Sequence, residues 1–398
     1  MRILYVKSAE LIPYVYRTLA SMGHEVEIFE GETTSITRST ELLGKMLEYH
    51  LSERGQGYYD FAISFNFFYI VSEVCQKHSL YYLSWIYDSP QVELYHKAIR
   101  NSYNLIFAFD KSLIRHLQLL GEANVFYCPL ASDVEGLADF RIENADMEKY
   151  GKEVAFVGHM YEDNTYNRTV AAAPETVQME MQQYLQNYLC RWNGMREWPA
   201  LSKEATDYFA ALSPEGAMLA YDMPLQEYFG CILLSRKLAE MERLTALDRL
   251  AKLCPLTIYT NSKSEFLDMI PAEKPGPVDY RTQMRKVFHL SRINLNFTMP
   301  SIETGVPLRV FDIMSVGGFC LTNAQEEVYE LFEVGKEIEV FHDVDELCAR
   351  CLYYLRHEDQ RLEIAINGFQ KVAKLYSYRT VLSKMLEKLE EKSKENNG

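Results

Sequence analysis

The most informative segment of the chain is Glu303-Thr-Gly-Val-Pro-Leu-Arg-Val-Phe-Asp312, followed by Ile313-Met-Ser-Val-Gly-Gly-Phe-Cys-Leu-Thr322. The pattern predicts a loop that is flexible at Gly305, a helix that begins near Pro307, and then a buried strand. Proline suits the first turn of a helix, because its missing N–H costs nothing there. The free N–H groups of such a turn, together with the helix dipole, form a site for an anion.

Two charged residues of this helix extend the pattern. Arg309 would add a guanidinium that can fork onto phosphate oxygens. A cation in the first turn opposes the helix dipole, so its placement favours an anionic partner over a surface ion pair. Asp312, one turn beyond Leu308, could accept hydrogen bonds from sugar hydroxyls. A phosphate cradle beside an acidic group suits a nucleotide sugar; the structural alternative is an ordinary strand–loop–helix turn of an α/β domain.

Composition limits the classes of function. The 398 residues should form two or three domains, and 48% hydrophobic residues suffice for ordinary cores. The net charge of −15 argues against nucleic-acid or anionic-membrane partners, so an anionic substrate requires a local cationic site. Met1–Val6 is expected to be a strand rather than a signal peptide, and no apolar run reaches the roughly 18 residues of a membrane span. We therefore expect a cytoplasmic protein.

The first part of the chain alternates short apolar strands with helical segments. The expected strands are Arg2–Val6, Glu25–Phe29, Phe61–Phe65, Tyr81–Trp85, Asn104–Phe109 and Val125–Tyr127. Such alternation predicts a parallel, doubly wound sheet. We expect a Rossmann-like domain over residues 1–135, followed by a polar linker.

A second α/β domain is expected over residues 151–343. Its strands are expected at Val154–Gly158, Leu256–Thr260, Ile293–Phe297, Phe319–Leu321 and Ile338–Phe341. From about residue 166 to 253 the pattern is helical, which predicts an α-helical insertion that shapes the acceptor side or mediates homo-oligomerisation. Residues 344–398 are predicted to be helical and charged.

Ligands of doubly wound sheets bind beyond the carboxyl ends of the strands, so the residues that follow strands are the candidates for a site. They are Asn66, Tyr87-Asp88-Ser89-Pro90, Asp110, Lys111, Gly158, His159, Thr260, Asn261, Thr298 and the loop Glu303-Thr304-Gly305-Val306-Pro307-Leu308, with Arg309 and Asp312.

Several of these residues have two interpretations. Asp88, in the turn Trp85-Ile-Tyr-Asp-Ser-Pro90, could be a general base for an acceptor hydroxyl or a turn residue before Pro90. Asp110 opens a helix, so N-capping is its simplest role. His159 could contact a phosphate or sugar, and Gly158 lets the backbone approach a ligand. Tyr280 could flank the nucleotide or begin a solvated helix.

The cysteines and one acidic pair resemble metal or redox motifs. Cys348-Ala-Arg-Cys351 has no second pair to complete a zinc site, so buried free thiols are the favoured interpretation. Asp343-Val-Asp345 precedes a helix with Glu346 three residues after Asp343, which is typical of a helix cap. We therefore expect no metal site.

The sequence resembles the CgeB-like glycosyltransferases, named after a spore maturation protein. The resemblance lies in Arg309–Thr322, Val328–Lys336, Phe156–Gly158 and Leu256–Thr260. The segments Asp60–Asn66, Tyr82–Pro90 and Asn104–Lys111 resemble the N-terminal domain that often accompanies this family.

The resemblance implies the GT-B fold, in which two Rossmann-like domains face a cleft. It places the acceptor in the first domain and the nucleotide sugar in the second, and it implies that the final helices pack back toward the first. Related enzymes carry two acidic residues with seven between them, for sugar and ribose; here eight residues separate Glu303 and Asp312. No Arg–Lys pair follows Gly158, so the stereochemistry of transfer stays open.

These observations predict a metal-independent glycosyltransferase without a cofactor, which uses a nucleotide sugar and a protein or surface-glycan acceptor. Asp88 is the candidate base, and Arg309 would stabilise the departing diphosphate. The alternatives are a GT-B nucleotide-sugar epimerase and a non-catalytic module that binds a nucleotide sugar or a partner. An NAD-dependent oxidoreductase is disfavoured, because Lys7-Ser-Ala-Glu10 contains no Gly-x-Gly-x-x-Gly turn.

Overall fold

The computed structural model describes residues 1–7, 14–31, 39–121, 124–192, 198, 200–212 and 222–397. Three of the four residues Lys7–Glu10 therefore lie outside the described part. The chain divides into two units. Unit 1 contains residues 1–131, 216–223 and 375–398, and unit 2 contains residues 132–215 and 224–374.

Unit 1 is built on a six-stranded parallel sheet in the order β2-β1-β3-β4-β5-β6. Its strands are β1 (Arg2–Val6), β2 (Glu25–Phe29), β3 (Phe61–Phe65), β4 (Tyr81–Trp85), β5 (Asn104–Ala108) and β6 (Val125–Tyr127). Only β5 differs from the prediction, by one residue at its end. Every residue of β3 and β5 is buried, as expected for strands covered on both faces.

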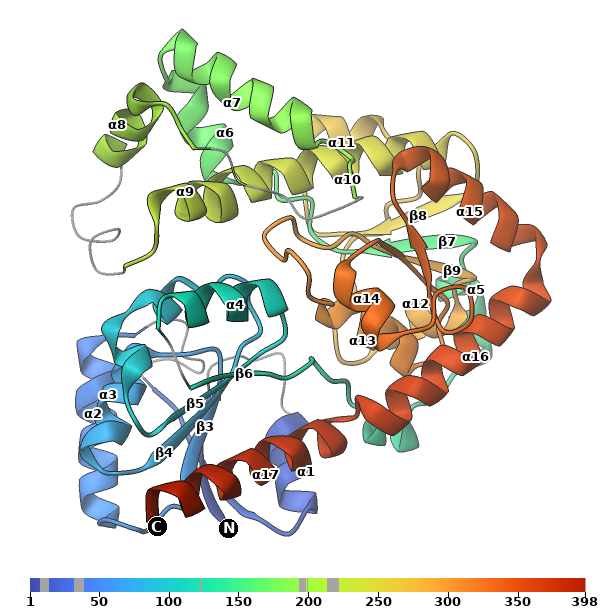
Figure 1. Ribbon diagram of the computed structural model, residues 1–398. Helices are drawn as coiled ribbons and strands as arrows, with labels where there is room; N and C mark the ends of the chain where they lie inside the picture. The colour runs from blue at the N-terminus through green and yellow to red at the C-terminus, as the bar shows by residue number, and fades with distance from the viewer. Residues whose placement is uncertain are drawn as a thin grey trace. The chain divides into compact units, whose positions relative to one another are not determined.

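The last helix of the chain belongs to unit 1. The helices of this unit are α1 (Tyr14–Ser21), α2 (Glu41–Arg54), α3 (Tyr69–Lys77), α4 (Lys111–Leu119) and α17 (Tyr378–Asn397), with 3-10 turns at Val92–Tyr95 and Lys97–Arg100. Figure 1 shows α2 and α3 on one side of the sheet and α17 on the other. Tyr378 meets Trp85 edge-on with ring centroids 5.9 Å apart, and Arg379 donates a hydrogen bond of 2.8 Å to Ser21 Oγ on α1.

Unit 2 contains a five-stranded parallel sheet in the order β11-β10-β9-β7-β8. Its strands are β7 (Val154–Val157), β8 (Leu256–Tyr259), β9 (Ile293–Asn296), β10 (Cys320–Asn323) and β11 (Glu339–Phe341). All of their residues are buried. The predicted strands are all present, with bounds that differ by one or two residues, and the two separate parallel sheets confirm the predicted fold class.

Helices cover the unit 2 sheet on both faces. They include α5 (Asn144–Tyr150), α11 (Glu265–Met269), α12 (Gln283–Leu290), α13 (Leu308–Ser315), α14 (Glu326–Leu331), α15 (Val344–Arg356) and α16 (Glu358–Leu375), and a 3-10 turn at Glu135–Asp139. α12 packs on α13 and β7, whereas α15 packs on β9 and on the insertion helix α10. α15 and nearly all of α16 therefore lie in unit 2, while α17 alone of the three final helices lies in unit 1.

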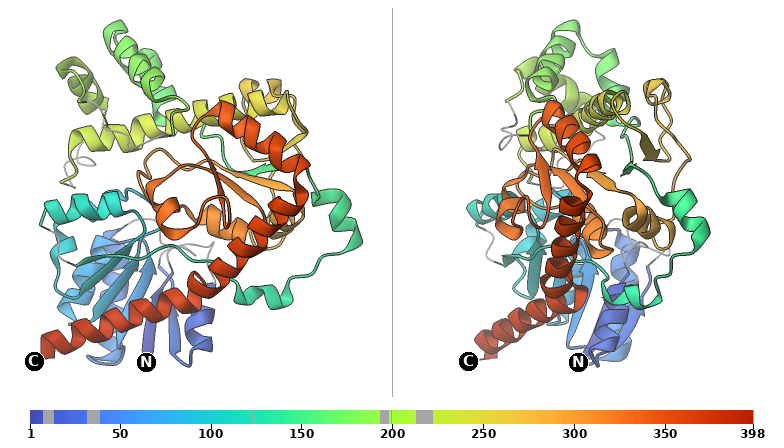
Figure 2. Two further views of the ribbon diagram at one scale, coloured as in Figure 1. Left: turned by 45° about the vertical axis from the view of Figure 1, so that its right-hand side comes forward. Right: turned by 90° about the vertical axis from the view of Figure 1, so that its right-hand side faces the viewer.

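The described residues of the predicted insertion form helices and their connections, and they contain no strand. It consists of α6 (Thr165–Thr169), α7 (Glu175–Tyr188), α8 (Lys203–Leu212), α9 (Leu225–Tyr228) and α10 (Ser235–Ala251), with a 3-10 turn at Val170–Ala172 and a π-helical segment at Phe229–Leu234. Residues 193–197, 199 and 213–221 of the insertion lie outside the described part. Figures 1 and 2 show α6, α7 and α8 on the side of α10 away from the strands. The long helix α10 thus connects these helices to the sheet.

The start of α15 supports a test of the Asp-x-Asp motif. Asp343 Oδ1 accepts the backbone N–H of Glu346 at 2.8 Å, so Asp343 is the N-cap, as the sequence predicts. Asp343→Ala should lower the free energy of unfolding by about 1 kcal/mol in a denaturant titration, because one N–H at the helix start loses its acceptor. Asp345→Ala, at an exposed position paired with Arg249, is the control and should cost at most about 0.5 kcal/mol. Equal effects of the two substitutions would contradict the capping role.

Candidate functional site

The loops that follow β7, β8, β9 and β10 meet at the carboxyl edge of the unit 2 sheet. The backbone N–H of Met160, after β7, donates to Ser262 Oγ, after β8, at 2.8 Å. The N–H of Thr298, after β9, donates to Asn323 Oδ1, at the end of β10, at 2.6 Å. Hydrogen bonds therefore connect these loops at the edge where open parallel sheets bind ligands.

Gly158 and His159 lie at this edge, directly after β7. The position that a Cβ of Gly158 would occupy is 2.7 Å from the ring of Phe156, a residue of β7. The absence of a side chain at Gly158 therefore makes room for this ring. His159 Nδ1 accepts the N–H of Tyr161 at 2.7 Å, and its side chain is 40% exposed. The accessible part of this ring can still meet a ligand.

Thr260 and Asn261, after β8, differ in exposure. Thr260 is buried, and its Oγ1 accepts the N–H of Ser262 at 3.0 Å. Asn261 is exposed. Of these two candidates, therefore, only Asn261 presents its side chain to solvent.

Asp312 lies at the centre of a polar cluster on α13. Its Oδ1 accepts the hydroxyl of Tyr280 at 3.1 Å, and its Oδ2 lies 3.3 Å from Arg309 Nη1. The guanidinium of Arg309 also lies over the ring of Phe288, with its Cζ 5.4 Å from the ring centroid. The two residues that the sequence analysis assigned to phosphate and ribose thus form an ion pair with each other.

Burial raises the pKa of Asp312 from 3.8 to about 6, although the charge of Arg309 and the hydrogen bond from Tyr280 both act to lower it. The side chain is only 10% exposed, so the loss of hydration destabilises the carboxylate by more than the charge of the half-buried Arg309 stabilises it. Asp312 is therefore mainly ionised at neutral pH. Each of its oxygens retains a lone pair for a further hydrogen bond.

The start of α13 differs from the prediction. Pro307 has an extended backbone (φ −71°, ψ 156°) and occupies the N-cap, so the first turn begins at Leu308. The N–H of Val310 donates to the carbonyl of Pro307 at 3.1 Å, which satisfies one donor of that turn. A proline side chain offers no oxygen to cap a helix, so the remaining backbone donors of the first turn depend on other partners.

The loop before α13 is fixed by buried side chains and by hydrogen bonds to α14. Thr304 is fully buried; its Oγ1 donates to Glu327 Oε1 at 2.9 Å, and its carbonyl accepts the N–H of Glu327 at 3.0 Å. Val306 and Leu308 are core residues, and Gly305 is also buried. The side chains of Thr304, Val306 and Leu308 thus fix the loop, and the charged side chains at its two ends, Glu303 and Arg309, are more exposed.

Arg243 of α10 is a residue of this edge that the sequence analysis missed. Its side chain is buried and donates to two carbonyl oxygens, through Nη2 to Phe297 at 2.8 Å and through Nη1 to His159. Its Cζ lies 4.7 Å from the ring centroid of Tyr161. Burial lowers the pKa of Arg243, but a guanidinium keeps its charge in proteins. Nothing in a helical pattern marks one arginine for a contact 84 residues away.

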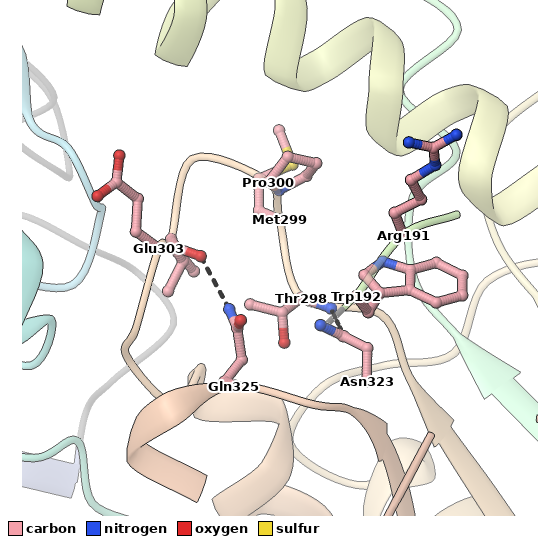
Figure 3. A pocket seen from close by; sticks show the side chains of 9 residues that line it. Arg191, Trp192, Thr298, Met299, Pro300, Glu303, Asn323 and Gln325 are labelled. Atoms are coloured by element: carbon pink, nitrogen blue, oxygen red, sulfur yellow. Dashed lines mark hydrogen bonds between the residues drawn. The ribbon is translucent and has the colours of Figure 1, made fainter. Parts of the chain in front are cut away.

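A small pocket opens between the loop after β9 and the segment that follows α7 (Figure 3). It is lined by Arg191, Trp192, Thr298, Met299, Pro300, Ile302, Glu303, Asn323 and Gln325. Gln325 Nε2 donates to the carbonyl of Ile302 at 2.8 Å, which fixes the base of the loop. Figure 3 shows Glu303 and Arg191 on opposite sides of the pocket, with the carboxylate of Glu303 pointing outward. Of these residues, Thr298 and Glu303 were candidates from the sequence.

The candidates of unit 1 have different roles. Asn66, after β3, has a positive φ of 61°; its Oδ1 accepts the N–H groups of Tyr87 and Asp88, and its Nδ2 donates to Asp88 Oδ2 at 2.8 Å. Asp88 is exposed. Asp110 is buried, caps α4 by accepting the N–H of Ser112 at 3.0 Å, and accepts the hydroxyl of Ser89. Asp110 is therefore an N-cap, the simplest role expected for it.

The cysteines are free thiols, and all of them except the half-buried Cys190 are buried. Burial raises the pKa of both Cys348 and Cys351 on α15. Within the described residues, no three His, Cys, Asp or Glu side chains are arranged to hold a metal ion. In that same part of the chain, no helix is both long and apolar enough to cross a membrane.

The buried carboxylate leads to a prediction about pH. Because the pKa of Asp312 is raised on folding, the folded state holds its proton more tightly than the unfolded state. The protonated side chain of Asp312 therefore adds to the free energy of unfolding at low pH. This contribution is nearly complete below about pH 4 and is lost as the pH rises through about 6. Asp312→Asn removes this loss, so its free energy of unfolding relative to wild type should increase by roughly 2–3 kcal/mol from pH 4 to pH 7.

Denaturant titrations at pH 4, 5, 6 and 7 would measure this difference. Asp139→Asn, at an exposed position of the turn Glu135–Asp139, controls for the removal of one carboxylate. A difference between Asp312→Asn and wild type that stays constant from pH 4 to pH 7 would show that Asp312 is not destabilised by its burial.

Comparisons with known proteins support the same fold. Residues 236–387 match a family model described as glycosyl transferase-like. A glycosyltransferase from Rickettsia africae aligns with a TM-score of 0.59 at 11% identity, over 99% of this chain and 98% of its own. Anabaena HepE in complex with UDP and glucose aligns with a TM-score of 0.54 at 10% identity, over 98% and 100%.

Sucrose-phosphate synthase of Thermosynechococcus elongatus aligns with a TM-score of 0.54 at 9% identity, over 98% of both chains. The comparison with curated protein sequences gives no match. The two parallel sheets, their order and these alignments along nearly the whole chain lead to one conclusion: the protein has the GT-B fold of glycosyltransferases, and its segment 236–387 matches the glycosyl transferase-like family.

Proposed function

We propose that the protein is a glycosyltransferase that moves a sugar from a nucleoside diphosphate donor to a hydroxyl group of an acceptor. The main support is the family match over residues 236–387, because this segment contains β8–β11, α13 and the ion pair between Arg309 and Asp312. We further propose that it is of the CgeB-like type, acts in the cytoplasm and takes a protein or surface glycan as acceptor, with homo-oligomerisation through the helical insertion.

The proposed donor site uses the ion pair on α13. Asp312 would accept hydrogen bonds from the ribose hydroxyls, and Arg309 would bind the diphosphate together with the backbone N–H groups of the first helical turn. Arg309 Nη1 lies 3.3 Å from Asp312 Oδ2, so the ion pair holds the guanidinium beside the proposed ribose ligand, and its other N–H groups would donate to a phosphate. Positive charge at this position stabilises the diphosphate as it departs, which allows transfer without a metal.

The proposed roles of the other residues follow from their exposure. Glu303, at the mouth of the pocket, would accept hydrogen bonds from hydroxyls of the sugar, and the exposed Asn261 and His159 would border the same edge. In unit 1, Asp88 would be the general base that takes the proton of the acceptor hydroxyl. Asn66 Nδ2 donates to Asp88 Oδ2 at 2.8 Å and so orients this carboxylate at the carboxyl edge of the unit 1 sheet.

The donor site can be tested by calorimetry with a panel of nucleotide sugars. Arg309→Ala should weaken binding by at least about 1.5 kcal/mol, because a charge-assisted hydrogen bond to phosphate is lost. Asp312→Asn should weaken the intact donor and the free nucleotide diphosphate alike, because both contain the ribose.

Arg249→Ala is the matched control for Arg309→Ala, since Arg249 is an exposed arginine of α10 paired with Asp345. Its affinity should equal that of wild type. If Arg309→Ala is folded and binds the donor as tightly as wild type, Arg309 has no role in binding the phosphates.

The base assignment rests on the rate of transfer. Asp88→Asn should retain donor affinity and lose about a hundredfold or more in turnover, if the enzyme transfers with inversion. Asp60→Asn is the control, because Asp60 is also exposed and accepts a backbone N–H, but it precedes β3 and lies at the amino edge of the same sheet. Turnover per folded molecule near that of wild type would reject Asp88 as the base.

Incubation with the donor alone separates the proposed function from its alternatives. A transferase should give only slow hydrolysis, and addition of an acceptor should accelerate donor consumption. Accumulation of an epimerised donor would instead identify an epimerase, and donor that stays intact with every acceptor would indicate a binding module.

A further inference from the structure

The pocket in Figure 3 is bordered by a positive charge that makes no ion pair with a described residue. Arg191 is exposed, and its guanidinium makes no hydrogen bond or ion pair with any residue that the structure describes. Glu303 is the one lining residue with a carboxylate, and Figure 3 shows it on the opposite side of the pocket, pointing outward. In a chain with a net charge of −15, an arginine that borders a pocket and makes no ion pair with a carboxylate of the described residues indicates an anionic ligand.

Trp192 adds a hydrogen-bond donor at the same place. Its side chain is 4% exposed, and its indole N–H has no acceptor among the described residues. The ring is fixed by Phe341, edge-on with ring centroids 5.1 Å apart, and by Phe297, with ring centroids 6.0 Å apart. A buried N–H without an acceptor is costly, and a ligand oxygen close to the ring would remove that cost.

The segment that carries both side chains is anchored to the sheet. The backbone N–H of Trp192 donates to the carbonyl of His342, directly after β11, at 3.0 Å. Because the ring is packed into the core, the backbone of the preceding Arg191 is held at the wall of the pocket. The positive charge is therefore tethered to a fixed point of the sheet edge.

Asn323 supplies a further hydrogen-bond donor to the pocket. Asn323 uses its Oδ1 to accept the N–H of Thr298, so its NH₂ group is the part that can serve a ligand. The pocket is small, so it suits one substituent of a ligand rather than a whole sugar ring. The lining of this pocket thus supplies a guanidinium, an indole N–H and an amide NH₂, and donors of these kinds bind the oxygens of a carboxylate.

We infer that this pocket binds the carboxylate of an acidic sugar, so that the protein uses a nucleoside diphosphate hexuronate as its donor. The inference rests on the proposed function, because it takes the sugar to lie beside Glu303 at the edge of unit 2. The guanidinium of Arg191 would form the ion pair, and the N–H of Trp192 would donate to the same group. A neutral sugar with a CH₂OH group in this place would leave the charge of Arg191 without a partner.

The test compares donors that differ only at this substituent. UDP-glucuronate with UDP-glucose, and GDP-mannuronate with GDP-mannose, are titrated by calorimetry against wild type, Arg191→Met and Arg191→Lys. Wild type should bind the acidic member of at least one pair about tenfold more tightly or better. Arg191→Met should bring the two members within about twofold, and Arg191→Lys should retain part of the preference.

Two further variants assign the effect to the pocket. Arg168→Met is the control, because Arg168 is an exposed arginine of the same insertion that pairs with Asp163 at 2.5 Å; it should keep the full preference. Trp192→Phe preserves the aromatic packing and removes the N–H, so the preference for the acidic sugar should fall several-fold. Equal affinity of wild type for both members of each pair that binds would overturn the inference and leave the proposed function intact.

Free UDP and free glucuronate separate the remaining outcomes. If Arg191→Met weakens free UDP as much as UDP-glucuronate, Arg191 binds the diphosphate and the inference is wrong. If no nucleotide binds, the proposed function fails, and free glucuronate still tests the pocket through tryptophan fluorescence. A change in the emission of Trp192 with glucuronate but not with glucose, absent in Arg191→Met and in Trp192→Phe, would support the pocket on its own; the lack of such a change would overturn it.

Discussion

The charge of Arg243 is the constraint on which the edge of the unit 2 sheet depends. A buried cation is costly unless it is compensated, and here the compensation comes from the carbonyl oxygens of His159 and Phe297 and from the ring face of Tyr161, while the Nε–H of Arg243 has no acceptor among the described residues. Both carbonyls follow strands, so the guanidinium fixes the distance between the loop after β7 and the loop after β9. It also fixes α10, and with α10 the helical insertion, to this edge.

The same edge explains how an acidic protein can accommodate an anion. Three arginines from three different segments, Arg191, Arg243 and Arg309, lie in loops and helices around the strand ends. Their charges are stabilised in different ways. Arg191 is exposed to solvent, Arg243 donates to carbonyl groups, and Arg309 forms an ion pair with Asp312. Among these groups Asp312 is the one whose charged form is destabilised, because burial raises its pKa to about 6. Destabilised groups of this kind gather at functional sites, because function fixes their positions more strictly than stability does.

The sequence predicts the strands to within two residues, since short apolar runs between turn residues leave few alternatives. Local rules also predict the caps Asp110 and Asp343, whose partners lie within three residues. Pro307 was placed one residue too far into its helix, because the signals for an N-cap and for a first turn overlap at proline. Arg243 and Trp192 could not be found this way: their partners lie 54 or more residues away, and burial of a helical arginine is a property of the fold alone.

The chain returns to unit 1 at its very end, and this order affects how the protein is made. During translation the strands β1–β6 leave the ribosome long before Tyr378, the residue that packs against Trp85, has been synthesised. At roughly 5–20 residues per second, that delay is on the order of ten seconds to a minute. Throughout this interval α17 cannot cover its face of the sheet, and Trp85 lacks the edge-on contact with Tyr378. A chain that stops before residue 375 would contain every strand of the unit 2 sheet but would lack α17, whose buried residues Val381, Leu382 and Met385 are part of the core of unit 1.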